Sequence, residues 1–572
     1  MTVSALVLSG EEPAPEALEA TGPGERRPRR RRLAVHLAAY AMILMALAPF
    51  MHLDTAWSVD EGLYVYQVRA LQQGDWKLEY WAESIDPDGR WFPLKNHQPG
   101  EGGFFPYIKS PAYPLLLWAV TTAVGDFGLH LLPLLGALGA AAAAWLLAAQ
   151  VDRRAAPFAF WIAAAGPVVV NAYAIWAHAP SAAVAGLTAY AAIRALRAGI
   201  SAPRLVGLCA GVALGVLLRT EGLLFAAAVT ATLGALGGIR LLTRAPDALR
   251  SILLAAVTGT TGLLVNALEH RWVVSIIDHS VTNDYVRGDA LPYLDGRLQG
   301  AKHVLWNESY FFTNNANLKV AVVAALVAGL ALRLGSRRAE VVAAGAMFVA
   351  SATLLVYLFR VPLDTVPGII PAWPAAIFGL LLLRWRDATQ VERVLAATVL
   401  LALLATLATQ YTFGGGFEWG ARYLSPLFPL VAALAALAFT RRFQRSAAMT
   451  RRHLAFFLVL LALVPAAGGL IAQARLRGGV DRWIEVAENG PQVVITSNEW
   501  RAQGAYRTFP ERQWLHVELP EIPVALERLA EAGYPGVTVL EPLSDWATEP
   551  SSVPDGYQVQ RDLGSAVVLT RS

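Results

Sequence analysis

The chain alternates long apolar stretches with short arginine-rich segments over most of its length. Apolar residues make up 55% of its 572 residues and charged residues only 16%, whereas soluble domains carry about 25% charged residues. A helix needs roughly 20 apolar residues to cross a bilayer core, and many of the stretches reach that length. The stretches are continuous rather than alternating in polarity, which excludes an outer-membrane barrel. The sequence therefore predicts a polytopic α-helical membrane protein.

The arginines give the predicted helices a direction across the membrane. An arginine block at 26–32 precedes the first apolar run, and cytoplasmic loops are enriched in Lys and Arg. A cytoplasmic N-terminus also puts the other arginine-rich loops in the cytoplasm. We predict about thirteen membrane helices, so the C-terminus is expected outside and the protein in the inner or plasma membrane. The predicted helices are 33–53, 128–150, 155–175, 181–197, 203–219, 222–239, 251–267, 318–334, 340–359, 369–384, 393–412, 423–440 and 454–474.

The chain divides into three predicted parts. Residues 1–32, rich in Pro, Glu, Ala and Arg, are expected to form a disordered cytoplasmic tail. Residues 33–477 form the membrane domain, with long extracytoplasmic loops at 54–127 and 268–317. The apolar stretch 111–124 in the first loop is too short to span and is predicted to be an interfacial or re-entrant helix.

Composition changes after the last membrane helix, and residues 478–572 are predicted to be a small extracytoplasmic α/β domain. The segment has strand-like pieces at 493–496, 536–540 and 566–569, and helical spacing at 522–532.

The remaining composition excludes several other classes. The net charge of +4 comes mostly from the N-terminal arginines and the basic loops, so it indicates topology and no nucleic-acid binding. Cys209 is the only cysteine, which excludes an intramolecular disulfide and a thiolate metal site.

The acids Asp60 and Glu61 follow the first predicted membrane helix on its outer side. Carboxylates near lipid are costly, so this pair is a candidate functional site. The alternative is that the two acids only cap an amphipathic helix at 62–72, because acids favour helix N-termini.

Further motifs follow these acids in the same loop. They are Gly74-Asp75-Trp76 and then Lys109-Ser110-Pro111, which enters the short helix. In this order the sequence resembles the GT-C superfamily of polyprenyl-phosphate-sugar glycosyltransferases. It is most similar to the protein O-mannosyltransferase-like branch and to the aminoarabinose transferase of lipid A. The number of spans and the C-terminal extracytoplasmic domain also match, so the expected architecture is GT-C-like.

The resemblance implies catalytic roles for the first loop. Asp60 and Glu61 would be the catalytic residues, with Asp60 as the general base, because an acceptor hydroxyl needs a base as it attacks the anomeric carbon. A single carboxylate fits direct displacement with inversion. Lys109 would neutralise the donor phosphate, although a lysine that snorkels to the interface is an alternative.

His178 departs from the pattern of the resembling families, which often carry Asp at the start of the fourth helix. This histidine could hydrogen-bond the donor phosphate or hold a metal with Asp60, or it could be an interfacial histidine beside Trp176. The families' extra acid before the lysine is also missing, since Tyr107-Ile108 stands there. A divalent metal is thus possible, and the cofactor stays unknown.

Two arginines lie at predicted outer helix ends. Arg219 goes against the positive-inside trend and is expected to have an anionic partner, either Glu221, another acid or a lipid phosphate. The glycine-rich stretch 414–420 contains Glu418 and leads to Arg422-Tyr423. This stretch is expected to bind phosphate or donor sugar, since glycines allow close approach of a ligand; the alternative is a tight loop with an aromatic-arginine anchor.

Together these features favour an inverting membrane glycosyltransferase. It would take a sugar from a polyprenyl-phosphate donor and pass it to an extracytoplasmic glycan, lipid or protein. The alternatives are a transporter or flippase, or a non-catalytic assembly component for lipid-linked glycans. A transporter should carry ionisable residues near the bilayer midplane, whereas nearly all candidates here lie at the outer helix ends.

Overall fold

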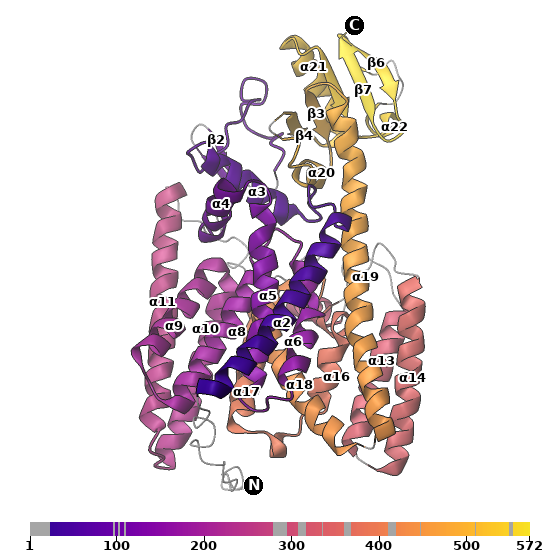
Figure 1. Cartoon of the computed structure of the whole chain (residues 1–572). Helices are drawn as coiled ribbons and strands as arrows, with labels where there is room; N and C mark the ends of the chain where they lie inside the picture. The colour runs from indigo at the N-terminus through magenta and orange to yellow at the C-terminus, as the bar shows by residue number, and fades with distance from the viewer. Residues whose placement is uncertain are drawn as a thin grey trace.

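The chain folds into a helical bundle that carries a smaller sheet-containing domain at one end (Figure 1). The computed structural model describes residues 23–94, 98–100, 103–107, 110–277, 294–306, 316–334, 336–359, 368–409, 419–446, 448–509, 511–547 and 553–571.

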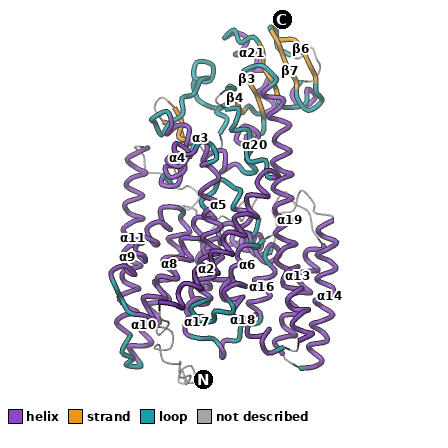
Figure 2. Tube along the Cα trace, in the orientation of Figure 1, coloured by secondary structure: helices purple, strands orange, loops and turns teal. Residues whose placement is uncertain are grey.

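Helices dominate the first 488 residues, as the purple segments of Figure 2 show. They are α2 (Pro23–Leu47), η2 (Ala48–Phe50), α3 (Val59–Gln72), α4 (Ala112–Val124), α5 (Gly128–Ala148), α6 (Ala156–Ala164), α7 (Pro167–Asn171), α8 (His178–Ala198), α9 (Ala202–Leu218), α10 (Thr220–Leu242), α11 (Ala248–Ile277), α12 (Leu294–Leu305), α13 (Ala316–Leu334), α14 (Arg337–Phe359), α15 (Ile369–Ala372), α16 (Pro374–Leu381), η3 (Trp385–Asp387), α17 (Gln390–Thr409), η4 (Arg422–Leu427), α18 (Phe428–Arg445) and α19 (Ala448–Glu488).

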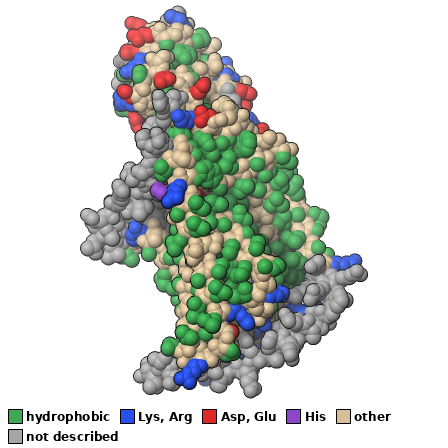
Figure 3. Space-filling view, turned by 90° about the vertical axis from the view of Figure 1, so that its left-hand side faces the viewer, with side chains coloured by type: hydrophobic (Ala, Val, Ile, Leu, Met, Phe, Trp, Pro, Cys, Tyr) green, Lys and Arg blue, Asp and Glu red, His purple; other side chains and the backbone are tan. Residues whose placement is uncertain are grey.

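The chain is a multi-pass membrane protein. Within the described ranges, nine helices are long and apolar enough to cross a bilayer. Each predicted membrane segment overlaps at least one helix, and residues 410–412 of the predicted segment 393–412 lie outside the described residues. The side view in Figure 3 shows a largely hydrophobic bundle below a domain whose surface mixes acids and bases.

Two of the predicted membrane helices are broken. The segment 155–175 divides into α6 and α7 at Gly166-Pro167, and 369–384 divides before Pro374. Proline disfavours a continuous helix, because it lacks an N–H and clashes with the preceding turn. The Trp373 indole N–H donates to the Ile162 carbonyl at 2.9 Å, which satisfies one carbonyl near the first break.

The predicted cytoplasmic loops meet one another. Arg197 donates to the Gln150 carbonyl at 2.5 Å, and Arg250 donates to the Leu196 carbonyl at 3.0 Å. Cations favour helix C-termini, where carbonyls lack intrahelical partners. These contacts join loops that the predicted topology puts on one side of the membrane.

Helices α3 and α4 lie at the end of the bundle that carries the C-terminal domain (Figure 1). Helix α4 coincides with the predicted short helix at 111–124. The second predicted loop, 268–317, is partly helical, because α11 continues to Ile277 and α12 follows at Leu294. A short hairpin of β1 (Gln98–Gly100) and β2 (Gly103–Phe105) completes the first loop.

The C-terminal domain is built on a five-stranded sheet with the order β4-β3-β5-β7-β6. Strands β4, β3 and β5 are parallel, and β7 and β6 are antiparallel additions. The elements are β3 (Val493–Thr496), α20 (Glu499–Gly504), β4 (Gln513–His516), η5 (Leu519–Glu521), α21 (Ile522–Glu531), β5 (Gly536–Val539), α22 (Leu543–Trp546), β6 (Tyr557–Asp562) and β7 (Val567–Arg571).

Helix ends differ from the predicted domain boundaries. Helix α19 runs without a break through the predicted boundary at residue 478 and delivers the chain to β3. At the other end α2 begins at Pro23, inside the arginine-rich segment predicted to belong to the tail. Its first residues lie at the end of the bundle opposite the C-terminal domain (Figure 1).

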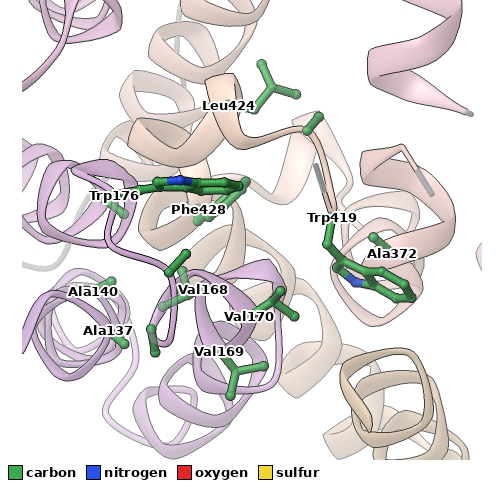
Figure 4. Packing of buried hydrophobic residues seen from close by; sticks show 14 of the residues in the cluster. Ala137, Ala140, Val168, Val169, Val170, Trp176, Ala372, Trp419, Leu424 and Phe428 are labelled. Carbon is green, nitrogen blue, oxygen red and sulfur yellow. The ribbon is translucent and has the colours of Figure 1, made fainter. Parts of the chain in front are cut away.

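The core beneath the outer segments is assembled from several chain regions. Figure 4 shows Trp176, Phe428, Trp419 and the valines of α7 in one buried cluster. A Cβ at Gly469 would lie 2.7 Å from the Trp419 ring, so the glycine lets α19 pack closely here. This core supports the segments that hold the candidate site.

Candidate functional site

Asp60 forms an ion pair with an arginine from a distant part of the sequence. Its Oδ2 lies 2.8 Å from Nη1 of Arg422, and the Asp60 side chain retains 24% exposure. Asp60 stands in the first turn of α3, and Arg422 begins η4 at the entrance of α18. The fold therefore joins two of the predicted motifs in one partly open ion pair.

Glu61 points into the protein and has a different environment. Its Oε1 accepts from Nη2 of Arg477 at 2.6 Å and from the Ile175 N–H at 2.8 Å. Its Oε2 accepts from the N–H groups of Trp57 and Ser58, at 2.8 and 3.3 Å. The Ser58 contact is half of a capping box. Glu61 therefore fits the capping alternative, while the neighbouring Asp60 keeps an exposed edge.

A tight turn aims Arg422 at Asp60. Gly420 has φ +74°, and Ala421 has φ +55°. A Cβ at Gly420 would lie 2.4 Å from Cγ of Pro167, so only glycine fits this turn. The left-handed conformation costs Ala421 about 1–2 kcal/mol, and such outliers are concentrated at functional sites.

Aromatic rings hold the guanidinium of Arg422 in place. Its Cζ lies 4.7 Å from the centroid of Trp176 and 5.2 Å from that of Tyr423. Arg219 approaches the same Tyr423 ring, at 5.9 Å. Cation–π contacts restrain an arginine without consuming its hydrogen-bond donors.

Arg219 has the anionic partner that its position required. Its Nε and Nη2 lie 2.9 and 3.0 Å from the two oxygens of Glu221, a bidentate pair in which both side chains are mostly buried. Arg219 stands where α9 ends and α10 begins. Of the anionic partners that the sequence suggested for Arg219, Glu221 is the one that pairs with it in this structure.

His178 is buried beside this cluster at the start of α8. Its ring lies 5.3 Å from Trp176 and 6.3 Å from Tyr423, edge-on to both. Neither ring nitrogen has a hydrogen-bond partner among the described residues. A buried polar group without a partner is costly, so this histidine stays a candidate for ligand binding.

Two tyrosines complete the site on the side of the first loop. The Tyr64 hydroxyl donates to that of Tyr107 at 3.1 Å. Burial raises the pKa of both phenols, so both stay neutral hydrogen-bonding groups at physiological pH. Gln67 donates to the Trp76 carbonyl at 2.8 Å and accepts from the Tyr107 N–H at 3.0 Å. The Gly74-Asp75-Trp76 motif therefore helps to position the Tyr107 segment.

Most of the predicted site residues come together, and two lie outside the described residues. Asp60, His178, Arg219, Glu221, Arg422 and Tyr423 form one neighbourhood. Lys109 and Glu418 are not among the described residues. The possible metal site at Asp60 and His178 stays a prediction, because the described part of the chain holds no group of three His, Cys, Asp or Glu side chains arranged as ligands.

Sequence reasoning missed Arg477, which holds Glu61. The signal was available, because Arg477 follows the last membrane helix on its predicted outer side. It goes against the positive-inside trend in the same way as Arg219.

Comparison with solved structures identifies the fold. ArnT from Cupriavidus metallidurans, solved with bound undecaprenyl phosphate, matches with a TM-score of 0.53 and 11% identity over 94% of this chain and 97% of that chain. The chain has a GT-C fold. The predicted GT-C-like architecture is thus confirmed at the level of the fold.

Weaker likenesses are to archaeal oligosaccharyltransferases. AglB from Archaeoglobus fulgidus, in complex with an inhibitory peptide and a dolichol-phosphate, has a TM-score of 0.45 at 13% identity, over 95% of this chain and 74% of that chain. No family model matches this chain, and no curated protein sequence does.

Proposed function

We propose that this protein is an inverting glycosyltransferase of the membrane. It takes a sugar from a polyprenyl-phosphate donor and transfers it to an extracytoplasmic glycan, lipid or protein. The observation that carries this proposal is the ion pair of Asp60 and Arg422, with Arg219 on the shared Tyr423 ring. A carboxylate beside two arginines supplies a base and the cations that a phosphate leaving group needs.

The reaction needs one base and one stabilised leaving group. Asp60 takes the proton of the acceptor hydroxyl while that oxygen attacks the anomeric carbon. The bond from this carbon to the phosphate oxygen breaks, and the electron pair leaves with polyprenyl phosphate. Attack opposite the leaving group inverts the configuration at the anomeric carbon.

Arg422 has two partners in this scheme. Without substrate its guanidinium pairs with Asp60 at 2.8 Å. A donor phosphate competes for the same donors, because arginine binds phosphate and carboxylate through the same planar fork. Donor binding thus frees an oxygen of Asp60 for the acceptor proton, and the base becomes available only when the donor is present.

His178 and Arg219 serve the donor phosphate in this proposal. The histidine nitrogens have no partner among the described residues, so a phosphate oxygen would satisfy one of them. Arg219 keeps its pair with Glu221 and contributes charge from the other side of Tyr423. The site opens on the extracytoplasmic side, with the N-terminus in the cytoplasm and the C-terminal domain outside.

The test is a transfer assay with the purified protein in lipid. A panel of polyprenyl-phosphate sugars is offered with envelope extracts as acceptor, and released polyprenyl phosphate is measured. We expect release with one donor and its loss in Asp60→Asn. Asp126→Asn, an exposed acid between α4 and α5, is the matched control and should retain activity.

The competing functions give different results. Donor movement between leaflets without release of polyprenyl phosphate would support a flippase. Donor binding that is unaffected by Asp60→Asn, with no turnover, would support a non-catalytic assembly component. Either result overturns the transferase.

A further inference from the structure

A cavity lies away from the Asp60 site, between the end of α3 and the C-terminal domain. Its volume is about 710 Å³, within the range of roughly 300–1,000 Å³ typical of small-molecule sites. One wall comes from the last turns of α3 and the following loop, and the other from the segment that leads into β4. None of the predicted site residues lines it.

The cavity presents accessible polar side chains from both sides. Gln72 and Gln73, at the end of α3, and Gln492, just before β3, are exposed residues that line it. A side-chain amide both donates and accepts hydrogen bonds, as a hydroxyl group does. Accessible amides on both sides of one cavity therefore fit a ligand with hydroxyl groups.

The lining chemistry matches a neutral carbohydrate. Trp81 and Phe509, both partly exposed, contribute aromatic surface, which packs against the apolar faces of sugar rings. Arg69 and Arg512 are balanced by the acids Glu79, Glu83 and Glu511. A polyanion would meet these three carboxylates, so a neutral, hydroxyl-rich ligand fits better.

A peptide strand is a less suitable occupant. Strand β4 is an edge of the sheet, and edges can accept an added strand. However, the His516 N–H already donates to the Trp91 carbonyl at 2.9 Å. The accessible amides of the cleft are also side-chain groups, whereas strand addition uses backbone groups.

The two walls are fixed relative to each other. The Tyr66 hydroxyl donates to the Ala502 carbonyl at 2.7 Å, and Arg528 donates to the Ile85 carbonyl at 2.8 Å. A Cβ at Gly62 would lie 2.1 Å from the Gln503 carbonyl oxygen, so α3 and α20 are in direct backbone contact. The cavity is thus a preformed cleft, which lowers the cost of binding.

We propose that this cleft binds a remote part of an extended neutral glycan acceptor. Asp60 and Arg69 are roughly 14 Å apart along α3, at about 1.5 Å per residue. A sugar in the cleft cannot be the one attacked at Asp60, so the acceptor must be a chain whose end reaches the base. The role as acceptor rests on the proposed transferase function, whereas glycan binding itself does not.

The first experiment measures binding without a donor. Fluorescent linear neutral oligosaccharides, from monosaccharides to hexasaccharides of glucose, mannose, galactose and arabinose, are titrated into the full chain in nanodiscs. We expect one series to bind, with affinity that rises with length. Gln73→Ala and Trp81→Ala should each raise the Kd about fivefold or more, because the first removes an accessible amide and the second removes aromatic surface from the cleft. Gln73 is exposed, so Gln73→Ala is the less disruptive variant.

Gln558→Ala is the matched control, since Gln558 is exposed on β6, the opposite edge of the same sheet. It should leave the Kd unchanged. The proposal is overturned if no oligosaccharide binds, if the two cleft variants bind as wild type does, or if random peptides bind and the variants abolish that binding.

A second measurement separates this proposal from the transferase. In the transfer assay, the cleft variants should raise KM for long acceptors and leave kcat and transfer to short acceptors unchanged. Variant-sensitive glycan binding without transfer from any donor would support the cleft and overturn the transferase. If the protein transfers sugar but the cleft variants leave the KM for long acceptors unchanged, the proposed role of the cleft is overturned and the transferase is not.

Discussion

Nη2 of Arg477 lies 2.6 Å from Oε1 of Glu61, and both side chains are fully buried. Arg477 also donates to the carbonyls of Met51 and Tyr173, at 3.1 and 2.6 Å. One arginine of α19 thereby fixes the end of the first membrane helix, the start of α3 and the segment before α8. This arrangement holds the backbone on which Asp60 stands.

Glu61→Gln should destabilise the protein strongly. Removing one partner of a buried ion pair leaves the other charge uncompensated, which costs about 3–5 kcal/mol. Thermal unfolding in detergent measures the effect as a lower Tm. Asp54→Asn is the control, because its pair with Arg507 is largely exposed and should contribute at most about 1 kcal/mol. Equal effects of the two variants would contradict a structural role of the buried pair.

Arg422→Gln should weaken donor binding more than it weakens folding. Hydrogen bonds to charged groups contribute about 1.5–3 kcal/mol, which corresponds to about a tenfold to hundredfold loss of affinity for polyprenyl phosphate. Arg422→Lys should recover only part of this loss, because lysine lacks the planar fork. Arg386→Gln, at an exposed arginine of η3, is the control. Wild-type affinity in Arg422→Gln, measured by titration with fluorescent undecaprenyl phosphate, would refute the assignment.

His178→Phe should leave stability near that of wild type and lower donor affinity. No protein hydrogen bond is lost, because neither ring nitrogen has a partner among the described residues. His516→Phe provides the contrast, since a ring nitrogen of His516 lies 3.1 Å from the Ser497 carbonyl oxygen. Loss of this hydrogen bond should lower the free energy of unfolding by about 0.5–1.5 kcal/mol. Unfolding curves and donor titrations on both variants distinguish a ligand-binding histidine from a packing one. A clear drop in Tm with unchanged donor affinity in His178→Phe would assign the residue to packing.

Gly420→Ala should lower both stability and donor affinity. The residue has φ +74°, and the new Cβ would meet Pro167 at 2.4 Å. The change should cost at least about 1 kcal/mol and displace Arg422. Gly479→Ala, with no atom within 4 Å of a new Cβ, should instead stabilise α19 by up to about 1 kcal/mol. Donor titration of Gly420→Ala at low temperature, where the variant is folded, tests the effect on the site. Wild-type donor affinity there would mean that the turn does not position Arg422.

Local pattern predicted most of the elements but few of their ends. The strand at 493–496 and the helix at 522–532 follow from alternation and helical spacing, and the structure has them at β3 and α21. Strands β4 and β6 were missed. Gln513–His516 is short, and β6 is exposed at all but its first residue, so neither gives a clear apolar pattern.

The sequence by itself determined that this chain crosses the membrane many times, and its arginine distribution predicted which loops share a side. Both follow from hydrophobicity and charge, which act on each segment separately. Only the tertiary structure decided that Asp60 meets Arg422, that Glu61 is held by Arg477, and that α3 and β4 enclose a cleft. These contacts join residues hundreds of positions apart. They depend on how the helices pack, and segment hydrophobicity does not specify that packing.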